Sequence, residues 1–203
     1  LAPYYPPGTQ FPVTCGPRYA HWKQFRTPDA HVPPREPHVL FASSLPWWDI
    51  ETTVDAIQHL LIAGAPRHRL VMQLHPLAKP TRRSMRALHR MAHRGFIAFA
   101  SASLIENLAN ASVVIGMNTT VLEEAALQGR AVLVLETERY LSFAPPLSVR
   151  CRAAALTWEV IADAQRRCAE RRSVLQEEAR IGLGIDAPTF RVGHTVRSTV
   201  SGR

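Results

Sequence analysis

The chain has 203 residues, of which 46% are hydrophobic, and it carries a formal net charge of +8. This length allows one large domain or two small ones, and the apolar fraction is enough for a core without disulfide or metal staples. No apolar run approaches the roughly 20 residues that a transmembrane helix needs, and no signal-peptide pattern opens the sequence. These totals favour a globular protein.

The cysteines indicate the cellular compartment of the protein, and its charge indicates the kind of partner to expect. The three cysteines, Cys15, Cys151 and Cys168, are far apart and form no CxxC pair, which suits a reducing compartment. Of the 24 basic residues only Lys23 and Lys79 are lysine, and the arginines are scattered. The net charge invites a nucleic-acid partner, but the scatter of the arginines and their excess over lysine weigh against one, and attraction to phosphate-bearing ligands or an anionic membrane face stays open. We therefore expect a cytoplasmic protein, with peripheral contact at the inner membrane face as a further expectation.

Proline dominates the start of the chain. Residues 1–37 contain nine prolines, and proline disfavours a long helix or a central strand. This composition predicts an extended arm or interdomain linker with one short strand near residues 11–15. We expect three segments: the arm at residues 1–37, an α/β domain at residues 38–150, and a C-terminal helix and tail at residues 151–203.

From residue 38 onward, short apolar runs alternate with amphipathic stretches. The predicted strands cover residues 39–42, 70–74, 96–100, 112–117 and 131–135, and the predicted helices cover residues 49–63, 82–93, 104–109, 121–128 and 158–180. Such alternation implies right-handed βαβ crossovers. The predicted fold class is α/β, with a Rossmann-like, mostly parallel sheet and helices on both faces.

Three of the predicted helices carry capping signals at their start. Asp49 is a favourable N-cap for the first helix. Ser103 and Glu106 have the spacing of a capping box. Thr120 and Glu123 have the same spacing, so a capping role for Thr120 competes with a role in ligand binding.

Polar residues follow three of the predicted strands at their carboxyl ends. In a parallel sheet these ends meet at one edge, where open α/β sheets bind their ligands. The residues are Ser43 and Ser44 after the first strand, His75 after the second, and Asn118, Thr119 and Thr120 after the fourth. The last three also precede a helix, whose first N–H groups and dipole favour an anion. The sequence therefore predicts a nucleotide-phosphate site at this edge.

Each of these side chains suits a different part of a nucleotide. Thr119 and Thr120 can offer hydroxyls to a phosphate. Glu124, four residues after Thr120 on the same helical face, can accept hydrogen bonds from a ribose diol or simply favour the helix dipole. His75 is held extended by Pro76 and is the candidate catalytic residue. It can bind a diphosphate as imidazolium or act as a base when neutral.

Metal and cofactor motifs are absent from the sequence. His89 and His93 are four residues apart, which is metal-ligand spacing, but no third ligand accompanies them. A solvated basic helix face explains them better. The chain has no GxGxxG, P-loop or GxSxG motif, and we expect neither a metal nor a cofactor.

Two stretches resemble a known family. LVMQLHP, and after a helix SLIENLANASVVIGMNTTVLEEAALQGRAVLVLE, are similar to the C-terminal nucleotide-binding domain of GT-B-fold enzymes. The likeness is greatest to bacterial surface-polysaccharide enzymes: capsule glycosyltransferases, polysialyltransferase-like proteins and CDP-glycerol glycerophosphotransferases. The matching residues are His75-Pro76, Thr119-Thr120, Glu124-Ala125 and Gly129. The stretch VTCGPRYAHW is similar to the segment that leaves the N-terminal domain of such enzymes.

The resemblance implies the donor-binding half of a metal-independent transferase. His75 and the Thr119-Thr120 pair would contact the phosphates of a nucleotide-activated sugar or polyol donor, and Glu124 would contact ribose or sugar. GT-B enzymes place the acceptor site in an N-terminal domain, whereas only residues 1–37 precede the sheet here. We therefore expect either a truncated enzyme or a donor-binding domain without turnover of its own, completed by a missing N-terminal domain or a partner chain.

Two alternatives stay open. Non-hydrolysing UDP-N-acetylglucosamine 2-epimerases share the fold and a similar order of Glu-Glu-Ala, Gly and Thr-Glu-Arg. This chain lacks their Gly-Gly before the helix and their His-Arg segment after the first strand. The other alternative is a basic, non-catalytic module for nucleic acid or an anionic surface, whereas the transferase hypothesis expects no nucleic-acid partner.

Overall fold

A computed structural model describes residues 36–117, 119–137 and 148–182, without the side chains of residues 178, 179, 181 and 182. The chain divides into a unit of Thr27–Ala179 and a unit of Leu1–Arg26 with Arg180–Arg203. The sheet and the helices that cover it belong to the first unit, except for the last three residues of the final helix. Residues 1–35 of the predicted arm with its short strand, Asn118 and the C-terminal tail lie outside the described residues.

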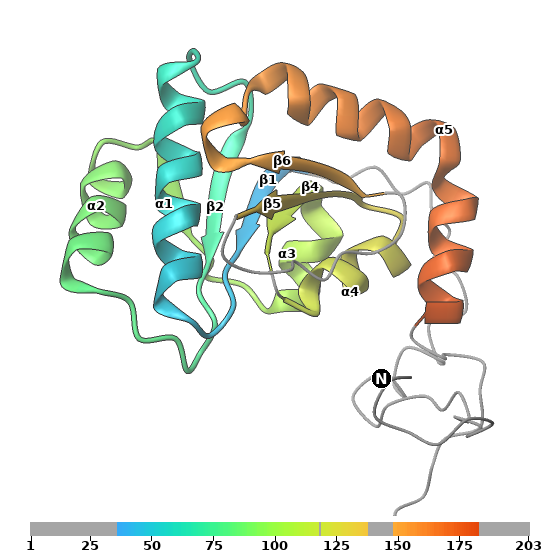
Figure 1. Cartoon of the computed structure of the whole chain (residues 1–203), viewed down its shortest axis with the longest axis horizontal. Helices are drawn as coiled ribbons and strands as arrows, with labels where there is room; N and C mark the ends of the chain where they lie inside the picture. The colour runs from blue at the N-terminus through green and yellow to red at the C-terminus, as the bar shows by residue number, and fades with distance from the viewer. Residues whose placement is uncertain (1–35, 118, 138–147, 183–203) are drawn as a thin grey trace, which may run out of the picture. The chain divides into compact units, whose positions relative to one another are not determined.

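Within the described residues, six parallel strands form one sheet in the order β3-β2-β1-β4-β5-β6 (Figure 1). The direction of strand order changes between β1 and β4, and open α/β sheets bind ligands at such a switch point. The predicted α/β class with a mostly parallel sheet is confirmed. The strands are β1 (His38–Ala42), β2 (Arg69–Gln73), β3 (Ile97–Phe99), β4 (Ala111–Gly116), β5 (Ala131–Glu136) and β6 (Val149–Arg152).

Helices cover both faces of this sheet (Figure 1). One face carries α1, α2 and the first part of α5, and the other carries α3 and α4. The helices are α1 (Trp47–Ile62), α2 (Arg82–His93), α3 (Leu104–Asn110), α4 (Val121–Leu127) and α5 (Trp158–Gly182).

The sequence of β1 explains the two layers. Val39 and Phe41 belong to the core beneath α1 and α2, whereas Leu40 and Ala42 belong to the core beneath α3 and α4. Successive side chains of a strand point to opposite faces, so a strand in the middle of a parallel sheet is apolar throughout. All five residues of β1 are buried, as this position requires.

The first residues of the observed helices can be compared with the predicted N-caps. The capping box of α3 is confirmed: Ser103 Oγ accepts from the Glu106 amide at 3.3 Å, and the Glu106 carboxylate accepts from the Ser103 amide at 2.9 Å. The N-cap prediction for Asp49 is wrong. Helix α1 begins at Trp47 with Pro46 at the N-cap position, so Asp49 lies inside the first turn.

Strand β6 and the bend of α5 were not predicted. β6 has only four residues, VRCR, and its two arginines weaken the apolar signal of a buried strand. It pairs with β5 in parallel at the edge of the sheet. In α5, Arg171 has non-helical dihedral angles (φ −126°, ψ 22°), which divide the helix into two segments. None of the described helices has the length and apolar character needed to cross a membrane.

Gly116 ends β4 where this strand runs beside β1. A Cβ atom at this position would lie 2.7 Å from the Ala42 carbonyl oxygen and 3.1 Å from Cγ2 of Thr119. Contacts this short with backbone force a shift of one of the strands. The hydrogen at Gly116 therefore allows the turn that carries Thr119 to stay close to the end of β1.

We predict that Gly116→Ala lowers the free energy of unfolding by about 1–3 kcal/mol, the usual cost of overpacking, as measured by urea denaturation. Gly95 supplies the control because it has φ +74° but no atom within 4 Å of the place that a Cβ would take. Asn tolerates such a backbone, so Gly95→Asn should cost little and Gly116→Asn should cost at least as much as Gly116→Ala. Equal stability of the two Asn variants would contradict the close-approach argument.

Candidate functional site

The carboxyl ends of β2, β1 and β4 lie side by side in the sheet. Ala42 is in register with Gln73 of β2 and with Gly116 of β4. Adjacent strands are about 4.8 Å apart, so the ends of β2 and β4 are separated by about 10 Å with β1 between them. The structure thus brings the turns that carry His75, Ser43 and Thr119 to one edge.

His75 is tied directly to the end of β1. Its amide donates to Ser43 Oγ at 3.1 Å, and its ring Nδ1 accepts from the Leu77 amide at 3.1 Å. A ring whose Nδ1 accepts a hydrogen bond is neutral and carries its proton on Nε2. In this arrangement the half-buried His75 offers an N–H donor, which suits an anionic oxygen better than proton abstraction.

The two serines after β1 are engaged inside the protein. Ser43 is buried, its amide donates to the Gln73 carbonyl at 3.0 Å, and its hydroxyl accepts from His75. Ser44 is buried as well, and its hydroxyl and its amide both donate to the Asp49 carboxylate, the amide at 2.6 Å. Both residues therefore shape the β1–α1 turn, and direct ligand contact by either one stays a prediction.

Asp49 is the buried charge that holds this turn. Only 1% of the residue is exposed, and Thr53 Oγ1 also donates to its carboxylate, at 3.4 Å. Burial raises the pKa of Asp49 above its ordinary value of 3.8, while the hydrogen bonds from Ser44 and Thr53 oppose the increase. The sequence showed an acidic residue near a helix start but not this bonding pattern.

The turn after β4 differs from the predicted capping box. Thr120 occupies the N-cap position of α4 in αR conformation and makes no side-chain cap hydrogen bond. Thr119 Oγ1 instead accepts from the Val121 amide at 3.3 Å. The alternative of a capping box at Thr120 and Glu123 is therefore wrong: the Glu123 amide donates to the Thr120 carbonyl at 3.1 Å and not to the Thr120 hydroxyl. Both threonines are half-buried.

Glu124 lies on α4 with only 4% of its surface exposed. It is not isolated, since it takes part in a hydrogen-bonding or electrostatic interaction. Its backbone amide donates to the Thr120 carbonyl at 3.1 Å, which places it one turn beyond Thr120 as predicted from the spacing. A role for Glu124 in binding ribose or sugar stays a prediction.

A further polar contact supports the end of β2. Asn107 on α3 donates from Nδ2 to Gln73 Oε1 and to the Ala102 carbonyl, each at 3.0 Å. The bond to Gln73 joins two residues that are 34 positions apart, so no local pattern in the sequence predicts it. It fixes the strand residue that lies two positions before His75.

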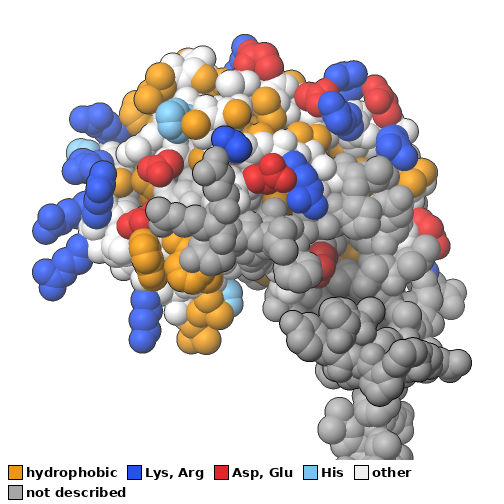
Figure 2. Space-filling model, in the orientation of Figure 1, with side chains coloured by type: hydrophobic (Ala, Val, Ile, Leu, Met, Phe, Trp, Pro, Cys, Tyr) orange, Lys and Arg blue, Asp and Glu red, His pale blue; other side chains and the backbone are white. Residues whose placement is uncertain are grey.

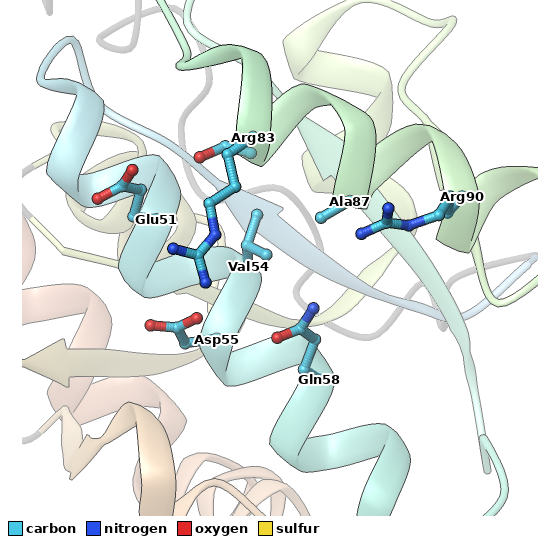
Figure 3. Close-up of a pocket in the computed structure, with 8 residues that line it drawn as sticks. Glu51, Val54, Asp55, Gln58, Arg83, Ala87 and Arg90 are labelled. Carbon is cyan, nitrogen blue, oxygen red and sulfur yellow. The ribbon is translucent and has the colours of Figure 1, made fainter.

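The described residues also form a cavity of about 230 Å³ between α1 and α2, which Figure 3 shows. Its walls carry Glu51 and Asp55 from α1 and Arg83 and Arg90 from α2. None of the predicted site residues lines it. His89 and His93 are exposed on α2, and within the described part of the chain no three His, Cys, Asp or Glu residues are grouped as a metal site.

No protein-family model matches the chain, and no curated protein sequence matches it. Several solved structures have a similar fold. An alpha,alpha-trehalose-phosphate synthase (UDP-forming) from Burkholderia vietnamiensis has a TM-score of 0.54 and 18% identity, over 87% of this chain and 49% of that one. A glycosyltransferase from Rickettsia africae ESF-5 has a TM-score of 0.52 and 12% identity, over 87% of this chain and 52% of that one.

A third similar structure is AviGT4, described as a glycosyltransferase involved in avilamycin A biosynthesis. It has a TM-score of 0.50 and 15% identity, over 87% of this chain and 53% of that one. The chain thus spans about half the length of each of these three structures. At these identities the likeness shows the fold, a Rossmann-like α/β sheet that occurs in glycosyltransferases.

Asp49 gives a test of the β1–α1 turn. We predict that Asp49→Ala lowers the free energy of unfolding by about 1–3 kcal/mol, because the amide and hydroxyl of Ser44 lose their acceptor. Asp49→Asn keeps one acceptor oxygen and should cost less. Urea denaturation of both variants at neutral pH measures the difference, and an Asp49→Ala variant as stable as the parent would contradict the role assigned to this carboxylate.

The same carboxylate gives a pH dependence. The pKa of Asp49 is higher in the folded state than the ordinary value of 3.8, so the folded state binds more protons between the two values. The stability that Asp49 contributes therefore falls as the pH rises from about 3.8 through the folded pKa. Asp49→Asn cannot titrate, so its deficit relative to the parent should shrink over that range. A deficit that stays constant in urea titrations from pH 4 to pH 7 would rule out this account.

Proposed function

We propose that the chain is the donor-binding half of a GT-B-type glycosyltransferase or glycerophosphotransferase in bacterial surface-polysaccharide synthesis. The observation that carries the proposal is the meeting of the β2, β1 and β4 ends at the switch point of the sheet. The fold that the chain shares with glycosyltransferase structures supports it.

The proposed donor site uses neutral hydrogen-bond donors. His75 supplies Nε2–H, and the hydroxyls of Thr119 and Thr120 lie about two strands away. The amides of Thr119 and Thr120 have no acceptor among the described residues, so they are further donors at this turn. Fixed donors of this kind stabilise the charge that develops on a leaving nucleotide phosphate. Glu124 would accept from ribose or sugar hydroxyls, and Ser43 and Asn118 would complete the proposed site.

The acceptor half is proposed to come from elsewhere. The chain covers about half of the similar structures, and we infer that a further N-terminal domain or a partner chain supplies the acceptor site. The function proposed for this chain on its own is therefore donor binding, and turnover belongs to the completed enzyme.

Calorimetry with CMP, CDP, UDP and GDP tests donor binding. We expect one of these nucleotides to bind the folded chain with a stoichiometry of one, and the diphosphate to bind more tightly than its monophosphate. Absence of binding by all four to a protein with a cooperative unfolding transition would overturn the proposal.

Two substitutions of His75 separate its roles. Asn places an acceptor where Nδ1 lies and keeps the bond to the Leu77 amide, but it removes the outer donor. Gln places an N–H group near the position of Nε2. We predict that His75→Asn retains stability and weakens nucleotide binding about 10- to 100-fold, the worth of a hydrogen bond to a charged group, whereas His75→Gln retains more of the affinity. If His75→Asn bound the nucleotide as tightly as the parent, the imidazole ring would have only a structural role.

Thr119 has a matched control in Thr157. Each threonine accepts a hydrogen bond from an amide at a helix start, from Val121 at 3.3 Å and from Val160 at 3.4 Å. We predict that Thr119→Val and Thr157→Val lower stability by similar amounts, about 1 kcal/mol, and that only Thr119→Val weakens nucleotide binding. Equal affinities of the two variants would remove Thr119 from the proposed site.

A further inference from the structure

Most of the excess positive charge of the chain lies in one short stretch. Residues 79–94 contain six lysines and arginines and no acidic residue, against a formal net charge of +8 for all 203 residues. All six are exposed, and they are Lys79, Arg82, Arg83, Arg86, Arg90 and Arg94. We name this set the α2 basic face.

Packing of α2 explains why these charges point outward. The opposite side of the helix buries Ser84, Ala87, Leu88 and Met91 against the sheet. The cations are thereby confined to the solvent side, and Figure 2 shows Lys and Arg side chains gathered along the margin of the molecule where Figure 1 places α2. The apolar side of the helix belongs to the core and is not available to a partner.

The α2 basic face is also not neutralised within the described part of the chain. None of its six cations forms a salt bridge there, whereas Arg67, Arg69, Arg150 and Arg167 each pair with a carboxylate. The cavity in Figure 3 brings acids near it, because Glu51 and Asp55 of α1 line this cavity together with Arg83 and Arg90, and the view shows the two acids on the side of Arg83. Lys79, Arg82, Arg86 and Arg94 do not line this cavity.

Exposed apolar side chains lie at both ends of this helix. Leu77, which precedes α2, is 70% exposed, and Phe96, which follows it, is 38% exposed. A row of cations bounded by exposed apolar residues matches the interface of an anionic bilayer, where charge meets headgroups and apolar groups reach the acyl boundary. A nucleic-acid backbone offers the cations a partner but offers Leu77 none.

We propose that the α2 basic face, with Leu77 and Phe96, docks the protein reversibly on an anionic lipid bilayer. Attraction is electrostatic, since the apolar face of α2 stays in the core, and the two apolar residues add contact at the ends. The proposal is independent of the donor site, but Leu77 lies two residues after His75, so docking sets the switch-point edge close to the bilayer.

Sedimentation with extruded vesicles tests this proposal on the full chain. We expect binding to vesicles of phosphatidylglycerol and phosphatidylcholine, little binding to pure phosphatidylcholine, and a steep loss of binding between about 0.1 M and 0.5 M salt because screening shortens the reach of the charges. No binding to the anionic vesicles at the lower salt concentration overturns the proposal.

A pair of triple variants localises the contact. Arg82→Gln/Arg86→Gln/Arg94→Gln removes three charges from the α2 basic face and should weaken partitioning about 100-fold, at roughly fivefold per charge. The control, Arg67→Gln/Arg150→Gln/Arg167→Gln, removes the same net charge from exposed arginines that are paired elsewhere and should change partitioning less than about threefold. Equal losses in the two triples would overturn the assignment to α2.

The apolar arm of the test separates a bilayer from nucleic acid. Leu77→Ser/Phe96→Ser should weaken vesicle binding several-fold, while Val174→Ser, an exposed apolar residue on α5, should not. The protein could instead bind a single-stranded or duplex oligonucleotide more tightly than vesicles, with no effect of Leu77→Ser/Phe96→Ser on that binding. This result would overturn the bilayer proposal and identify nucleic acid as the partner. Thermal unfolding of each variant checks that the fold is intact. Nucleotide calorimetry on the same variants measures whether the donor site is affected, so a loss of vesicle binding can be told apart from a loss of nucleotide binding.

Discussion

The arrangement of the candidate site depends on the approach of β4 to β1. The Ala42 carbonyl oxygen lies 2.7 Å from the place that a Cβ at Gly116 would take, so any side chain there would force one of the two strands to shift. The turn after β4 therefore starts beside the end of β1, with Thr119 packed against Gly116. On the other side of β1, the bond from the His75 amide to Ser43 holds the end of β2. One central strand thus positions both outer turns.

The fold was predictable because its signals are local and repeated. Buried β-branched runs, a capping box at Ser103 and glycine at a helix end each mark an element without reference to the rest of the chain. The missed features depend on contacts between distant residues. β6 is a strand because β5 offers an edge to pair with, and its own sequence, VRCR, has little apolar signal. The capping roles considered for Asp49 and Thr120 failed for local reasons. Helix α1 begins two residues before Asp49, whose carboxylate accepts from Ser44, and the Glu123 amide donates to the Thr120 carbonyl.

The location of the candidate site could be predicted from the sequence, but the role of each residue in it could not. Strand ends in a parallel sheet converge whatever their sequence, so the neighbourhood of His75, Ser43 and Thr119 follows from topology. The roles depend on hydrogen bonds that the sequence does not specify. Ser44 faces a buried carboxylate, and His75 is held by the Leu77 amide in a tautomer that donates from Nε2. A neutral ring that donates from Nε2 differs from both roles that the sequence left open, an imidazolium that binds a diphosphate and a neutral base.

The two anion-directed features of the molecule differ in physical kind. The proposed donor site consists of an imidazole, hydroxyls and amides, whose hydrogen bonds act at short range and depend on geometry. The α2 basic face consists of full charges on the solvent side, whose attraction extends to about a Debye length and weakens with salt. The positive charge of residues 79–94 lies on the solvent side of α2 and in the turns at its two ends, not among the groups of the proposed donor site. Basic composition, which first suggested phosphate-bearing ligands, is therefore better explained by a surface for docking than by the donor site itself.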